Sequence, residues 1–151
     1  MENLEKLEKI TLNMWGSECE FELSFDSYCE TPEEIMILKD VWQNFIKLPN
    51  FEELINSTKQ NVEDFCLEII NGCGPDKDDP EYAVWIDGIV DGKINNIFDC
   101  IEPMYVMVSG YKSSPEIGIA FNTWPRLGDK NLVIVFCNNQ FKEVQDEPSF
   151  L

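Results

Sequence analysis

The chain has 151 residues, of which 29 are acidic and 11 basic, so its formal charge at pH 7 is −18. It contains no histidine, which removes the commonest general acid–base residue and a frequent metal ligand. The acidic excess repels phosphates and anionic lipids. It therefore argues against nucleic acid and membranes as partners and favours a basic protein.

Apolar residues make up 44% of the sequence, enough to expect one folded domain over residues 1–151. No apolar run is long enough to predict a membrane-spanning helix, and the acidic N-terminus does not resemble a secretory signal. The six cysteines include no CxxC pair. We therefore expect a cytoplasmic protein whose thiols are reduced, with neither a disulfide nor a thiolate metal site.

The first predicted element is a β-hairpin of residues 9–14 and 19–25, with the chain reversing at Gly16-Ser17. In its second strand, positions 19, 21, 23 and 25 are apolar and face one way, whereas Glu18, Glu20 and Glu22 face the other. These three glutamates, called the strand row below, predict an acidic outer face.

Two amphipathic helices are predicted next. Thr31-Pro32-Glu33-Glu34 has the capping-box arrangement of a helix start, and an apolar stripe that includes Trp42 runs on to Pro49. Asn50-Phe51-Glu52-Glu53 begins the second helix, which glycines at 72 and 74 end. Because the joint between the helices is short, we expect an antiparallel helical hairpin with Trp42 in the core.

The second half of the chain begins with an acidic loop and continues as β-structure. Two prolines, Pro75 and Pro80, make the start of the acidic stretch 74–93 a loop, and a short helix is predicted over 94–101. Four turn-bounded strands follow at 104–111, 117–124, 132–137 and 141–145, typical of an antiparallel meander. The predicted fold class is therefore α+β: an antiparallel sheet, made of the N-terminal hairpin and the C-terminal four-strand meander, packed against the helical hairpin.

The residues that could carry chemistry favour no enzyme. Asp76-Lys77-Asp78-Asp79 lacks the spacing of an EF-hand loop, so a solvated acidic loop is favoured and only a weak, irregular calcium site stays open. Carboxylate pairs arise by chance among 29 acids. No cysteine has a histidine to activate it, and Gly72-Cys73-Gly74-Pro75 lacks the Lys and Ser/Thr of a phosphate-binding loop. We expect no catalytic residue, no metal and no cofactor.

Several segments carry a resemblance to a known family. They read Asn-Asn-Ile-Phe at 95–98, Pro-Met-Tyr-Val at 103–106, Phe-Asn-Thr-Trp at 121–124 and Leu-Val-Ile-Val-Phe-Cys-Asn-Asn-Gln-Phe-Lys-Glu-Val at 132–144, with 14–18 and 21–25 near the start. The chain resembles a family of small bacterial proteins with relatives among the immunity proteins of polymorphic toxin and contact-dependent growth inhibition systems. Relatives often have an acidic-His-Gly turn before the penultimate strand, where residues 127–131 here read Leu-Gly-Asp-Lys-Asn, so a role of that histidine does not carry over.

Charge and resemblance together predict an immunity protein that binds and neutralises a basic toxin domain, a nuclease, because nucleases hold phosphates in basic clefts. The alternatives are a carboxylate-based, metal-dependent hydrolase and an acidic adaptor for another basic protein. For Trp85, core packing is the alternative to an interface anchor. The predicted partner-binding residues, with the strand row as second choice, are Asp76, Asp78, Asp79, Glu81, Tyr82, Trp85, Asp87 and Asp91.

Overall fold

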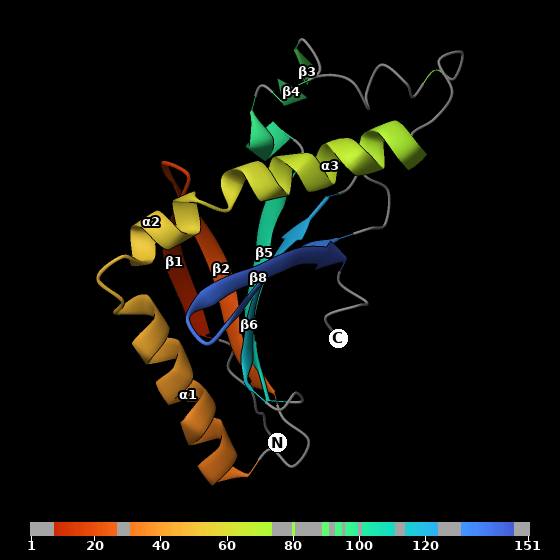
Figure 1. The fold of residues 1–151 in the computed structure, drawn as a ribbon. Coiled ribbons are helices and arrows are strands. Elements are labelled where there is room, and N and C mark those ends of the chain that lie inside the picture. Colours follow the sequence, from red (N-terminus) through yellow and green to blue (C-terminus); the bar gives the residue numbers. More distant parts are fainter. Residues whose placement is uncertain are drawn as a thin grey trace.

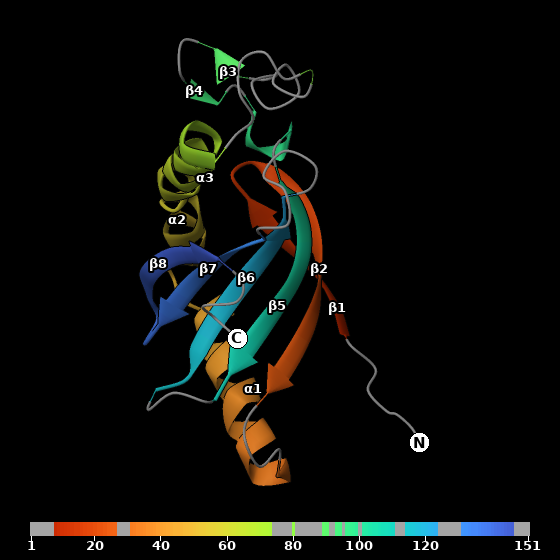
Figure 2. The same cartoon turned by 90° about the vertical axis from the view of Figure 1, so that its right-hand side faces the viewer.

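The computed structural model describes residues 8–26, 31–73, 80, 89–90, 93–94, 96–99, 101–110, 114–123 and 131–146. Six strands form one mixed sheet in the order β1-β2-β5-β6-β7-β8. The helices lie on one face of this sheet, as Figures 1 and 2 show from two directions. The predicted α+β class is confirmed.

The N-terminal hairpin is present as predicted. Strand β1 (Glu8–Met14) pairs antiparallel with β2 (Ser17–Asp26), with Met14 opposite Ser17 at the closed end. The reversal lies one residue earlier than predicted, at Trp15-Gly16, where both residues have positive φ angles of 53° and 88°. A two-residue turn with two positive φ angles fits the right-handed twist of the flanking strands.

The C-terminal meander is also confirmed. It consists of β5 (Glu102–Ser109), β6 (Glu116–Asn122), β7 (Leu132–Cys137) and β8 (Gln140–Asp146), each antiparallel to the next. Strands β6 and β7 are buried almost throughout, which explains their continuous apolar runs.

The prediction of an antiparallel sheet is wrong at one junction. Strand β2 runs parallel to β5, with Glu22 in register with Tyr105 and Asp26 with Ser109. Parallel neighbours require a long crossover rather than a tight turn, and the helices between the two strands lie within that crossover. The hairpin and the meander are thereby one sheet.

The helical region differs from the predicted antiparallel hairpin. The structure has α1 (Pro32–Ile46), a short α2 (Phe51–Asn56) and α3 (Lys59–Cys73), and α1 and α3 lie at a wide angle to each other instead of side by side (Figure 1). The predicted second helix is interrupted at Ser57-Thr58, where the hydroxyls donate to the carbonyls of Leu54 and Ile55 at 2.7 and 2.6 Å. Such side-chain bonds compete with the helical backbone ladder.

The start of α1 follows the predicted capping box. The Thr31 hydroxyl accepts a hydrogen bond of 3.2 Å from the backbone N–H of Glu34, and Pro32 is the first helical residue. This satisfies one of the donors that a helix start leaves without an intrahelical partner.

The described residues between 89 and 101 contain less helix than the sequence predicts. A two-stranded ribbon of β3 (Ile89–Val90) and β4 (Lys93–Ile94) precedes a single 3₁₀ turn, η1 (Ile97–Asp99). Isolated helices of about one turn are marginal on their own, and Ile94, Ile97 and Ile101 are nearly fully buried. Packing therefore holds this segment.

The main core lies between the helices and the inner face of the sheet. Trp42 is 3% exposed, which confirms its predicted core position. The ring of Phe45, on the same helix, lies 5.0 Å from that of Phe136 on β7 and 5.2 Å from that of Phe51 on α2. These aromatic contacts fix α1 against the end of β7.

Candidate functional site

The first predicted contact surface, residues 76–91, falls outside the described residues for all eight named side chains. Asp76, Asp78, Asp79, Glu81 and the other residues of that set therefore keep the status of a sequence prediction. The choice between a core and an interface role for Trp85 stays open for the same reason.

The second predicted surface, the strand row, is part of the described structure. Glu18, Glu20 and Glu22 are exposed on β2 and alternate with Cys19, Phe21 and Leu23, which are at most 4% exposed. Because a strand advances about 3.3 Å per residue, the three carboxylates repeat at about 6.6 Å along one face. The prediction of an acidic outer face is confirmed.

The cross-strand neighbours leave most of this charge uncompensated. Asn13, Thr11 and Lys9 on β1 stand opposite Glu18, Glu20 and Glu22 in register order. Within β1 and β2, Lys9 is the one basic residue, and it is opposite the last glutamate of the row. The described edge of the sheet formed by β1 and β2 therefore carries net negative charge on its outer face.

The outer face changes character at the next strand. Glu22 is in register with Tyr105 on β5. The next residues across the sheet in the same register are Ala120 on β6 and Val133 on β7. Ala120, Val133 and Val135 are fully buried and pack with the partly buried Met104, Tyr105 and Met107. The strand row thus borders an apolar strip, with β5 as the boundary.

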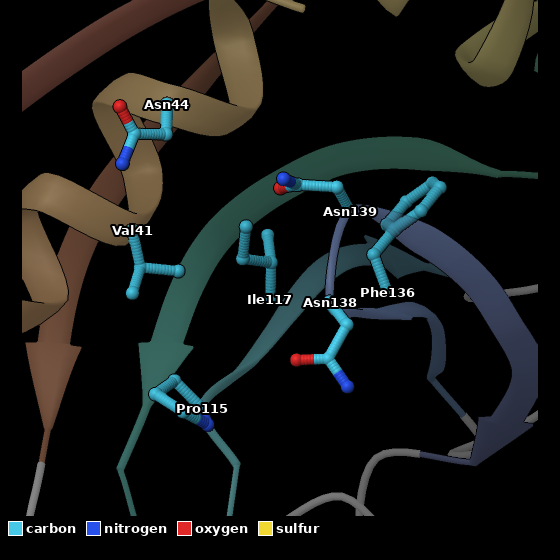
Figure 3. A pocket seen from close by; sticks show the side chains of 7 residues that line it. All are labelled: Val41, Asn44, Pro115, Ile117, Phe136, Asn138 and Asn139. Atoms are coloured by element: carbon cyan, nitrogen blue, oxygen red, sulfur yellow. The ribbon is translucent and has the colours of Figure 1, made fainter.

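A pocket on the helical side was not found by sequence reasoning. It has a volume of about 160 Å³ and lies between α1, the start of β6 and the turn joining β7 to β8 (Figure 3). Polar side chains of Asn44, Asn138 and Asn139 surround an apolar floor. The residues that line it are Val41, Asn44, Pro115, Ile117, Phe136, Asn138 and Asn139.

The sequence signals for this pocket were present but separate. Asn138-Asn139 was interpreted as a turn, which is correct: their φ angles are 54° and 63°. Val41 and Asn44 lie on α1, and no sequence pattern shows that this helix end meets that turn. Three segments far apart in the chain must pack before the pocket exists.

One face of α1 is exposed and partly apolar. Met36 and Ile37 are 62% and 57% exposed, although the helix buries Leu38, Trp42 and Phe45 on its opposite side. Glu33, Asp40 and Asn44 are also exposed. We call Glu33, Met36, Ile37, Asp40 and Asn44 the α1 face.

An ion pair lies near the end of the meander. Lys142 Nζ is 2.6 Å from Glu116 Oε2, and the two side chains are 43% and 4% exposed. The hydrogen bond that Lys142 donates to Glu116, together with the negative charge of that carboxylate, raises the pKa of Lys142 above its usual value. Because the register of β7 and β8 shifts between Val135 and Phe136, this pair ties the irregular part of β8 back to β6.

Cys19 and Cys66 are buried, Cys137 is partly buried, and none of these three forms a disulfide. Burial raises the pKa of the Cys19 thiol, which makes it a poorer nucleophile. Across the ranges given above, no three Cys, Asp or Glu side chains gather as a metal site. No described helix combines the length and the apolar character that crossing a membrane requires.

Comparison with known proteins identifies no relative: no protein-family model, no curated protein and no solved structure matches the chain.

Proposed function

We propose that this protein is a cytoplasmic immunity protein, which binds a basic toxin domain and blocks its activity. The observation that carries the proposal is the strand row, three exposed glutamates on one face of β2 with a single lysine opposite, in a chain of net charge −18. A nuclease fits as the toxin, because a protein that cleaves nucleic acid holds phosphates with basic residues.

Electrostatics gives such a pair of proteins a kinetic advantage. Opposite net charges accelerate the diffusional encounter, and association rates of charge-matched proteins exceed those of neutral pairs by orders of magnitude at low salt. An immunity protein must capture its toxin before the toxin reaches its substrate. The acidic surface supplies this speed, and residues 76–91 remain the predicted direct contacts alongside the strand row.

The test uses the protein domain encoded by the reading frame directly upstream of this gene, which is where the proposal places the toxin. Binding is measured at about 50 mM and about 500 mM salt for the wild type and for a triple variant, Glu18→Gln, Glu20→Gln and Glu22→Gln. We expect the triple variant to associate about tenfold more slowly at low salt, with the difference shrinking at high salt because screening shortens the reach of charge.

A matched variant controls for the loss of three charges. Glu52, Glu53 and Glu68 are exposed on α2 and α3, and changing them to Gln removes the same charge from another part of the surface. We expect a smaller loss of association rate in this control. Absence of a complex between the wild type and the upstream domain at low salt would contradict the proposal.

A second readout separates immunity from adaptor function. An equimolar amount of this protein is added to the upstream domain in an assay of nucleic-acid cleavage. Inhibition supports the immunity role, whereas a complex that leaves cleavage unchanged favours an acidic adaptor.

A further inference from the structure

We propose that the α1 face and the adjoining pocket form the anchor site for the partner, and that the pocket takes one apolar side chain flanked by arginine or lysine. This inference rests on the proposed function, because it assumes a basic protein as the partner. It differs from that function in assigning the tight contact to α1, which neither charge nor sequence pattern identified.

The first observation is the composition of the α1 face. At 3.6 residues per turn, positions 33, 36, 37, 40 and 44 share one side of a helix, and this side is opposite the buried residues of α1. Met36 and Ile37 are the two large apolar side chains that stand exposed in the described part of the chain. Single exposed apolar residues need no explanation, but these two are neighbours and continue into a pocket.

The second observation is this continuity. Val41 follows Ile37 by one helical turn and lines the pocket, and Asn44 belongs to both the α1 face and the pocket wall. In Figure 3 the Val41 side chain points from the helix toward Ile117 and Pro115 across the open space. The pocket volume of about 160 Å³ is close to that of a cavity of about 150 Å³ that holds one benzene ring. One phenylalanine or leucine side chain therefore fits.

The third observation is charge, which selects the occupant. Glu33 and Asp40 flank Met36 and Ile37, and no basic residue lies on the α1 face. Lys39 lies to one side, with Nζ 6.0 Å from the centroid of the Phe25 ring. A second copy of this chain would bring two acidic faces together at a net charge of −18 each, which costs association energy. A basic partner is attracted electrostatically by the same acidic residues that repel a second copy of this chain.

The strand row and the α1 site have different roles in binding. Helix α1 lies on one face of the sheet (Figure 2). The strand row alternates along β2 with buried residues that face the core, so it lies on the other side of the sheet from α1. Interfaces draw most of their affinity from a few desolvated anchors in pockets. The strand row therefore accelerates approach, and the α1 site slows dissociation.

The test compares substitutions on two different helices, with the upstream-encoded domain as the probe. Ile37→Asp removes an apolar contact and adds a negative charge at a position 57% exposed. Asn61→Asp adds the same charge at an exposed position on α3, away from the α1 face. We expect Ile37→Asp to raise Kd at least about 30-fold through faster dissociation, whereas Asn61→Asp leaves Kd within about twofold.

A third variant tests the pocket itself. Val41→Phe places a ring in the open space, so we expect faster dissociation with retained folding, checked by thermal unfolding. Equal Kd values for wild type, Ile37→Asp and Val41→Phe would overturn the anchor site and leave the proposed function intact. A wild type that binds no upstream domain would overturn both, and a homodimer that Ile37→Asp dissolves would overturn the assignment to a basic partner.

Discussion

Two hairpin turns in this protein have the same backbone shape and different origins. Trp15-Gly16 joins β1 to β2 with φ angles of 53° and 88°, and Asn138-Asn139 joins β7 to β8 with φ angles of 54° and 63°. Asparagine enters this left-handed region at little cost, whereas tryptophan does not. The second turn is explained by its own residues, and the first requires help from elsewhere in the fold.

That help comes from the junction of α2 and α3. The Trp15 backbone N–H donates to Asn56 Oδ1 at 3.1 Å, and its indole N–H lies 3.1 Å from the Ile55 carbonyl and 3.3 Å from the Thr58 hydroxyl. The ring stacks on Phe121, with centroids 5.6 Å apart and planes at 21°. Tertiary contacts thus stabilise the Trp15-Gly16 turn. The Asn138-Asn139 turn is stabilised by the backbone preference of asparagine itself, so its side chains are available to line the pocket.

The largest expected effect follows from removing the external support. Trp15→Ala deletes the ring contacts with Phe121 and the indole hydrogen bonds, so we expect a loss of about 3 kcal/mol in the free energy of unfolding. Urea denaturation measures the loss. A loss below about 1 kcal/mol would show that the hairpin holds its shape without α2 and α3.

Gly16→Ala isolates the backbone contribution at the same turn. A Cβ at position 16 meets nothing within 4 Å, but the φ angle is 88°, so the cost arises only from backbone strain. We expect about 1.5 kcal/mol, from the left-handed penalty for an L-residue. Thermal unfolding of wild type and variant gives the value, and an unchanged Tm would contradict the strain.

Trp15→Phe separates the ring from the hydrogen bonds. The stacking on Phe121 remains, but the indole N–H is lost. The Ile55 carbonyl still accepts from the Thr58 hydroxyl at 2.6 Å, so no buried acceptor is left without a partner. We expect a loss of about 1 kcal/mol by urea denaturation, and a loss equal to that of Trp15→Ala would mean that the hydrogen bonds dominate.

The smallest effect on stability is expected at the second turn. Glycine tolerates the φ angle of Asn139, so Asn139→Gly should change the free energy of unfolding by less than about 0.5 kcal/mol. The Asn139 side chain lines the pocket, so binding of the upstream domain should weaken measurably. Unchanged binding together with unchanged stability would remove this turn from the proposed anchor site.

Local features of the fold were predictable from particular residues. The alternation of positions 18–23 gave the buried and exposed faces of β2, and Thr31 with Pro32 gave the start of α1. The sequence contains no local signal for the parallel pairing of β2 with β5, because register between distant strands depends on packing. The apolar positions of the predicted second helix keep a helical spacing on both sides of Thr58. The sequence pattern therefore did not indicate that the helix is divided there into α2 and α3.

The candidate site divides in the same way. The strand row depends on a period of two within one strand and could be read from the sequence. The pocket depends on α1 meeting the turn at 138–139, and that contact exists only in three dimensions.

The parallel pairing of β2 and β5 has a consequence for synthesis. Glu22 pairs with Tyr105, 83 residues further along the chain, and at translation speeds of about 5–20 residues per second β2 waits roughly 4–17 s for that neighbour. During this time the edge of the nascent hairpin that β5 later covers has no native partner, and such an edge readily pairs with other chains. Of the strand row, Glu22 lies on the part of β2 that β5 later covers, and its charge disfavours pairing of that edge with a second nascent hairpin until β5 has been made.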